Sequence, residues 1–266
     1  MKKQLWLEMG KQTLLSIAIF ACLFIALYLV ELFIPSLHGK LLQWDNLAFI
    51  VGIPASVIGT AYVLTIKNPN NYLGFYLGIV MSLLLAWQFY LQGQYDLVIL
   101  YTLLFVPFLL RSLITWRKAT LYPEPDAEPF VPSFLHTKQV FITRIIYWII
   151  ILADFGVVTY LSMRNPDAVI TFKGIFINLM GAMLIGSSIF ANYWLIHKSN
   201  DAWIYWVIYS LAGMVLNALI GNAFSFVLFT MFLIINGSAQ VAWIKMTDEQ
   251  HLGWTEPIHR ILNRTK

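Results

Sequence analysis

The side chains best suited to bind a ligand are neutral polar and aromatic residues that recur at helical spacing in the last third of the chain. Trp206, Ser210 and Asn217 fall on one face of a helix, and Asn236 and Gln240 follow at a spacing of one helical turn. Aromatic rings stack on a flat ligand, while amides and hydroxyls bind its edges. The pattern predicts a cavity for a flat, polar and mostly uncharged molecule, although small and polar residues also serve helix packing in membranes.

A second set of candidates lies in the first half of the chain. Gln88 shares a helical face with Gly78, Trp87 stands beside it, and Tyr101 lies in the next apolar segment. Pro107, further along that segment, predicts a kink. We expect Gln88, Trp87 and Tyr101 to line the same cavity as the residues of the last third.

Two further residues are candidates for a gate or for coupling to an ion. Asp154 lies inside an apolar segment, where a carboxylate costs about 2.5–3.5 kcal/mol and must face other helices. A structural alternative is that Asp154 ties two helices together or lies near the outer membrane surface. Trp203 begins its apolar segment, and aromatic residues at such positions also form interfacial belts.

No motif for catalysis or for energy coupling is found. The sequence has no Walker A motif, no HExxH or GxSxG motif and no cluster of carboxylates. Its five histidines lie in predicted loops or in the tail, and the single cysteine, Cys22, allows no internal disulfide. We therefore predict a protein that is not an enzyme and that has no catalytic residues, no metal site and no cofactor.

The composition shows which elements must position these side chains. Of 266 residues, 59 % are hydrophobic and only 11 % are charged, whereas soluble domains contain about 25 % charged residues. The chain is therefore an integral membrane protein. Its apolar runs are continuous rather than alternating, which predicts an all-α fold of eight transmembrane helices. The expected spans are 13–34, 46–66, 71–90, 97–115, 140–161, 170–191, 202–220 and 223–244.

The basic residues predict the orientation in the membrane. With the N-terminus in the cytoplasm, fourteen of the 17 lysines and arginines fall on the cytoplasmic side and three on the other. We expect a multi-pass protein of the cell membrane with both termini in the cytoplasm. Arg111, placed near the inner end of its helix, is the only cation expected close to the cavity.

Charge placement also suggests an internal repeat. The second predicted helix ends at Lys67 and the sixth at Lys198, an offset of 131 residues, and each half closes on a tryptophan followed by basic residues, at Trp116 and Trp243. This pattern predicts a parallel 3+1+3 duplication after one N-terminal extra helix; chance similarity between apolar segments is the alternative. The predicted parts are the extra helix (1–45), a three-helix repeat (46–118), a proline-rich loop with a connecting helix (119–162), the second repeat (163–247) and a cytoplasmic tail (248–266).

These features resemble the PnuC family of vitamin and nucleoside facilitators over residues 46–247. The resemblance is carried by Trp203-Ile204-Tyr205-Trp206 and by Gly93-Gln94-Tyr95 leading to Pro107 and Trp116. It implies three-helix units like those of the SWEET transporters and facilitated diffusion of nicotinamide riboside, with a cytoplasmic kinase that traps the product. Relatives that carry thiamine, riboflavin or deoxynucleosides are the alternatives.

Several positions depart from the nicotinamide riboside pattern. Those members have an asparagine four residues after the second tryptophan, and this chain has Ser210 there. In the fourth span they have an asparagine, and a Met-Gln pair after the proline. The corresponding residues here are Tyr101, Phe108 and Leu109. The changed pocket favours a related ligand of nucleoside type. A small-molecule transporter, with a homo-oligomer as one option and no nucleic-acid partner, is the main hypothesis. A membrane sensor or scaffold that transports nothing is the alternative from another class.

Overall fold

The computed structural model describes residues 2–34, 36, 39, 41–93, 95–122, 137–164, 171–221 and 223–246. Over these residues the secondary structure is helical without β-strands, and eight helical segments are long and apolar enough to cross a membrane. The all-α class and the number of spans are therefore confirmed. Residues 123–136 of the predicted proline-rich loop, and the whole predicted tail, lie outside the described residues.

The helices follow the expected order with some shifted ends. They are α1 (Lys2–Phe33), α2 (Leu47–Ile66), α3 (Gly74–Leu91), α4 (Tyr95–Ile99), the π-helical segment η2 (Leu100–Phe105), α5 (Val106–Leu121), α6 (Thr137–Arg164), α7 (Phe172–Ile196), α8 (Asp201–Ile220) and α9 (Ala223–Lys245). The first helix was expected to begin at residue 13 but begins at Lys2. Hydropathy marks where a helix is apolar, whereas the backbone hydrogen bonds continue through the polar turns before it.

The fourth span contains a π-helical segment where a kink at Pro107 was expected. Pro107 lies in the first turn of α5, directly after η2, and the Val106 N–H donates to the Tyr101 carbonyl five residues back. Proline has no N–H to offer the preceding turn, and its ring crowds the carbonyl four residues earlier. The chain meets this constraint by widening the turn before the proline.

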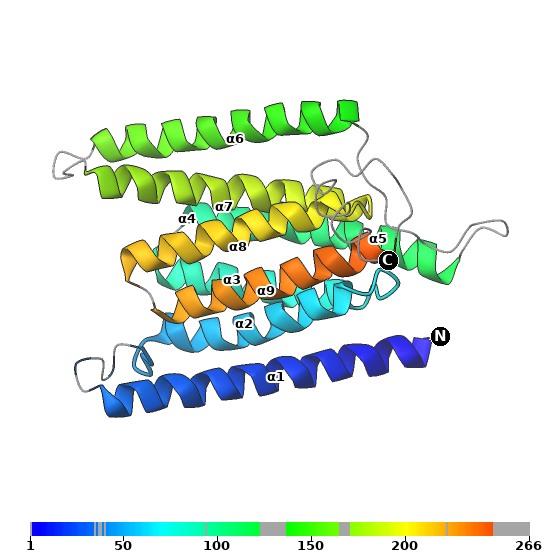
Figure 1. Ribbon diagram of the computed structural model, residues 1–266, viewed down its shortest axis with the longest axis horizontal. Coiled ribbons are helices and arrows are strands. Elements are labelled where there is room, and N and C mark those ends of the chain that lie inside the picture. Colours follow the sequence, from blue (N-terminus) through cyan, green and yellow to red (C-terminus); the bar gives the residue numbers. More distant parts are fainter. Residues whose placement is uncertain are drawn as a thin grey trace. The chain divides into compact units, whose positions relative to one another are not determined.

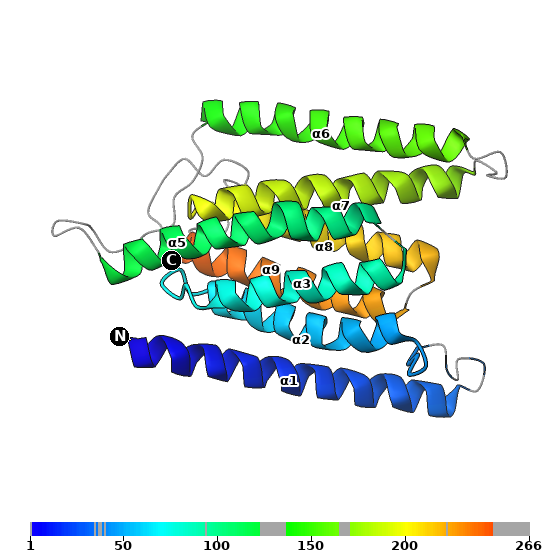
Figure 2. The ribbon, with the colours of Figure 1, turned by 180° about the vertical axis from the view of Figure 1, so that it is seen from behind.

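The chain divides into two compact units, and each is described by itself. The first, Met1–Phe130, holds α1 to α5, and α2 packs against both α1 and α3 (Figures 1 and 2). Glycines of α3 allow close approach, because a Cβ on Gly74 would lie 2.7 Å from Ile66 and one on Gly78 would lie 3.0 Å from Tyr62. The face of α3 that carries these two glycines therefore packs on α2.

The second unit, Val131–Lys266, holds α6 to α9 in sequential contact: α6 on α7, α7 on α8 and α8 on α9. The Tyr147 hydroxyl is 2.9 Å from Ser187 Oγ, and a Cβ on Gly186 would lie 2.7 Å from Ile151. Both contacts join α6 to α7. By its contacts α6 belongs to this unit and covers α7 (Figure 1), in the way that α1 covers α2 in the first unit.

One aromatic arrangement occurs in both units. Phe75, at the start of α3, lies edge-on to Trp116 of α5, with ring centroids 4.9 Å apart and planes at 86°. Trp203, at the start of α8, lies edge-on to Trp243 of α9, at 5.4 Å and 80°. The recurrence agrees with the predicted duplication, which stays a prediction. It aligns Phe75 with Trp203 at an offset of 128 residues rather than 131.

Candidate functional site

Three of the candidate residues meet where α8 packs on α9. Ser210 Oγ donates to the Trp206 carbonyl at 2.8 Å, and Asn236 Nδ2 donates to Ser210 Oγ at 2.9 Å and to the same carbonyl at 3.3 Å. All three side chains are buried. Asn236 Oδ1 is buried too and has no hydrogen-bond partner among the described residues. An unsatisfied buried acceptor is costly, so this oxygen is well placed to accept a hydrogen bond from a ligand.

A second amide pair lies one turn further along α9. Gln240 Nε2 donates to Asn200 Oδ1 at 2.9 Å, and both residues are buried. Asn200 is the N-cap residue of α8, but its side chain makes no capping bond. In the described structure Gln240 Oε1 and Asn200 Nδ2 have no partner, which leaves one acceptor and one donor unused.

Asn200 was not among the predicted site residues, because it lies outside the apolar spans. A signal was available: Asn200 stands three and six residues before Trp203 and Trp206, so its position continues their helical face. We call Asn200, Trp203, Trp206, Ser210, Asn236 and Gln240 the amide–tryptophan cluster.

The two tryptophans of the cluster lie inside the second unit. Trp203 is fully buried against Trp243, and its Nε1 has no hydrogen-bond partner within the described residues. Trp206 is also buried and packs edge-on against Tyr209, with ring centroids 5.3 Å apart. Neither ring has the exposure of an interfacial belt residue. Trp203 adds an unused donor to the cluster.

Asn217 is not tied to this cluster in the described structure. Its Nδ2 donates to the Gly213 carbonyl of the same helix at 2.8 Å, and the residue is buried. Side-chain bonds of this local kind satisfy a polar group without involving a neighbouring helix. Helical periodicity predicts that Asn217 shares a face with Trp206 and Ser210, and in the described structure its amide bonds within its own helix.

The candidates of the first half belong to the first unit. Gln88 faces α2, since a Cβ on Gly52 would lie 2.8 Å from Gln88 Nε2. Trp87 is 51 % exposed. Tyr101 is buried in η2 and stacks on Phe89 at 5.4 Å with planes 19° apart. A π-helical segment often marks a functional site, which keeps Tyr101 a candidate alongside Gln88 and Trp87.

Asp154 lies on the face of α6 that packs on α7. It is half-buried and stands seven residues after Tyr147 and three after Ile151, both of which contact α7. A side chain at this spacing points to the same side of the helix. The position agrees with the structural alternative, a carboxylate held between two helices, and leaves the gating role a proposal.

The charges closest in sequence to the cluster are in the turn between α7 and α8. Lys198 is buried, and this burial lowers the pKa of its ammonium to about 8. Asp201, fully buried, accepts a hydrogen bond from Ser199 Oγ at 3.1 Å. Arg111, expected to be the only nearby cation, is exposed on α5 in the first unit. Lys198 is thus a cation that the expectation overlooked.

The model of a family described as nicotinamide mononucleotide transporter matches residues 49–245, from α2 to the end of α9. The crystal structure of the vitamin B3 transporter PnuC has the same fold, with a TM-score of 0.54 and 17 % sequence identity over 93 % of this chain and 91 % of that one. No curated protein matches. Since the family model spans all but the first of the eight membrane helices, the chain belongs to the nicotinamide mononucleotide transporter family.

Proposed function

We propose that this membrane transporter is a facilitator for uptake of a nucleoside-type molecule, with nicotinamide riboside as the first candidate. The observation that supports the proposal most directly is Asn236. Its amide nitrogen is held by Ser210 and by the Trp206 backbone carbonyl, so its unused carbonyl oxygen has a defined direction. Pre-oriented polar atoms in an apolar site are what selective binding of a small polar molecule needs.

The remaining groups of the cluster suit such a ligand. Gln240 Oε1 offers a further acceptor, and Asn200 Nδ2 and Trp203 Nε1 offer donors. In our proposal Trp206 stacks on the heterocycle, and the unused donors and acceptors bind ribose hydroxyls and the edge of the base. Gln88, Trp87 and Tyr101, which belong to the first unit, stay candidates for substrate binding.

We propose that the substrate is the nucleoside rather than its 5′-monophosphate. The cluster itself contains only neutral side chains. A phosphate dianion buried there would lack compensating charge. Nucleosides should bind at least two orders of magnitude more tightly, a difference of about 2.8 kcal/mol. A cytoplasmic kinase would then trap the product and give uptake its direction.

A second candidate is a relative's substrate, such as a deoxynucleoside, thiamine or riboflavin. Ser210 favours this candidate, since its hydroxyl already donates to the Trp206 carbonyl and has no second proton for a ligand. An asparagine at this position would have more groups to offer. The remote alternative is a membrane sensor or scaffold without transport.

The remaining parts of the proposal follow from the sequence. Because the sequence has no nucleotide-binding motif, we propose that transport is passive and that the protein catalyses no reaction. In a passive transporter Asp154 can act as a gate but does not couple transport to an ion. Both termini face the cytoplasm by the distribution of basic residues.

The test is a binding series on the purified full-length protein. Nicotinamide riboside, thiamine, riboflavin, ribonucleosides and deoxyribonucleosides are compared by calorimetry, each nucleoside with its 5′-monophosphate. Asn236→Leu should weaken binding of the preferred ligand at least tenfold. Asn217→Leu is the matched control, because its amide bonds only to its own helix in the described structure. Equal binding of nucleosides and monophosphates would contradict the neutral site, and binding of none would favour the sensor or scaffold.

A further inference from the structure

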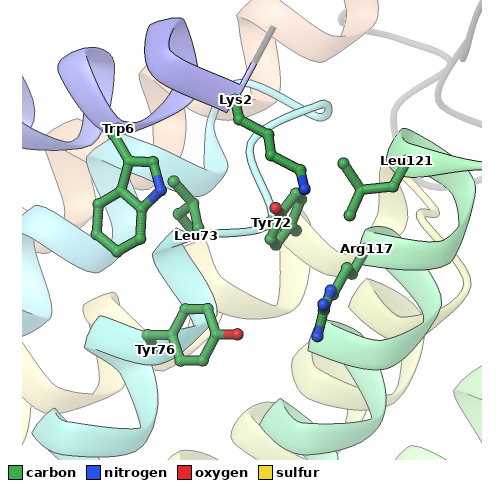
Figure 3. Close-up of a pocket in the computed structure, with 7 residues that line it drawn as sticks. All are labelled: Lys2, Trp6, Tyr72, Leu73, Tyr76, Arg117 and Leu121. Carbon is green, nitrogen blue, oxygen red and sulfur yellow. The ribbon is translucent and has the colours of Figure 1, made fainter.

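A cavity of about 290 Å³ lies at one end of the first unit, and none of its lining residues belongs to the amide–tryptophan cluster. Figure 3 shows Lys2 and Trp6 of α1, Tyr72 and Tyr76 at the start of α3, and Arg117 near the end of α5, with two leucines between them. The volume is at the lower end of the range for small-molecule sites, about 300–1,000 Å³.

The cavity has a positive charge that no lining residue neutralises. Lys2 and Arg117 approach it from different helices (Figure 3), and none of its seven described lining residues is acidic. The next carboxylate on α1, Glu8, is not one of the lining residues, and it accepts hydrogen bonds from Asn68 at 2.9 and 3.0 Å and from Asn71 at 3.4 Å. Two cations with tyrosine hydroxyls beside them form a site for an anion that has several acceptor oxygens.

The position along the spans suggests where that anion comes from. Lys2 begins the first span, Tyr72 precedes the third, and Arg117 lies in the last turns of the fourth. These ends fall at the same membrane surface, where lipid phosphates lie. Trp6 is 56 % exposed and Tyr76 is 43 % exposed, and such rings are typical of the headgroup level.

We propose that this cavity binds the phosphate of an anionic phospholipid headgroup at the end of α1. Lys2 and Arg117 bind the phosphate oxygens, and Trp6 and Tyr76 contact the glycerol region. The acyl chains follow the exposed apolar side of α1. Basic pockets between membrane helices are suited to such headgroups, chiefly on the cytoplasmic side, and this is the side that the basic residues predict for this end.

The test compares two double variants of the full-length protein in detergent. Lys2→Gln/Arg117→Gln removes both cations of the cavity. Lys11→Gln/Arg111→Gln removes two exposed cations of the same helices that do not line the cavity. Native mass spectrometry measures binding of phosphatidylglycerol and phosphatidylcholine to each. Added inorganic phosphate is the competitor that distinguishes a free anion from a lipid.

We expect the wild-type protein and the Lys11/Arg111 variant to prefer phosphatidylglycerol, and the Lys2/Arg117 variant to lose that preference at least tenfold. Arg117→Lys, which keeps the charge, should retain most of it. Equal loss in both double variants would overturn the proposal, because the effect would then be general surface charge. Displacement of the lipid by millimolar phosphate would overturn the lipid assignment. An unchanged melting temperature in phosphatidylcholine would show that the variants are folded.

Discussion

Gly213 allows Phe229 of α9 to approach α8 closely, and we predict that Gly213→Ala is strongly destabilising. An ideal Cβ at this position would overlap the ring of Phe229, and even Phe229 Cγ, the first ring atom, lies only 2.7 Å away. Rotation of the ring leaves Cγ in place, so the two helices must separate or Phe229 must leave its position. Overpacking of this kind costs about 1–3 kcal/mol.

Gly237→Ala on α9 is the matched control, because its Cβ would meet no atom within 4 Å. Both substitutions gain the helix propensity of alanine, about 1 kcal/mol, so this gain cancels when they are compared. Gly213→Ala should therefore be about 1–3 kcal/mol less stable than Gly237→Ala. Reversible unfolding in mixed micelles measures the difference.

The same substitution has a functional consequence. Ser210 lies one turn before Gly213, and its 2.9 Å hydrogen bond to Asn236 crosses the interface that must open. Gly213→Ala should therefore also weaken substrate binding. Adding Phe229→Leu should restore part of the stability and part of the binding, and a double-mutant cycle measures this restoration as a coupling energy between the two positions. Equal stability of the two alanine variants would refute the packing that we describe.

Three further predictions concern the site and its surroundings. Trp206→Ala should weaken nucleoside binding by about 1–3 kcal/mol, the range for base–aromatic stacking, whereas Trp148→Ala on exposed α6 surface should leave calorimetric affinity unchanged; equal effects would contradict stacking. Because burial lowers the pKa of Lys198 from 10.5 to about 8, the unfolded chain binds more protons between these values. Stability should therefore rise with pH from about 8 to 10.5, and a Lys198→Met variant with the same rise in its melting temperature would contradict this. Asp154→Asn should still let substrate equilibrate in proteoliposomes without ATP or an ion gradient; accumulation by the wild type under a proton gradient would instead make Asp154 a coupling residue.

The sequence was sufficient to predict an all-α membrane protein and the number of its membrane spans. A helix needs about 20 consecutive apolar residues to cross a bilayer, and runs of this length can be recognised in the sequence without a structure. The sequence also selected Trp206, Ser210, Asn236 and Gln240 as candidates, since polar residues in long apolar runs are rare; their binding role stays a prediction. Helix ends were less predictable, because backbone hydrogen bonding in α1 continues where hydropathy falls.

Only the tertiary structure decided which polar groups meet. Helical periodicity gives the direction of a side chain around its own axis, but not the helix that lies opposite. Asn217 and Asn236 look alike in sequence, yet Asn217 bonds within α8, while Asn236 reaches across to Ser210. Asn200 lies in a turn outside the spans, and only its hydrogen bond from Gln240 shows that it belongs to the amide–tryptophan cluster. These differences arise because side-chain packing, such as that of Phe229 on Gly213, sets the height and the facing sides of neighbouring helices.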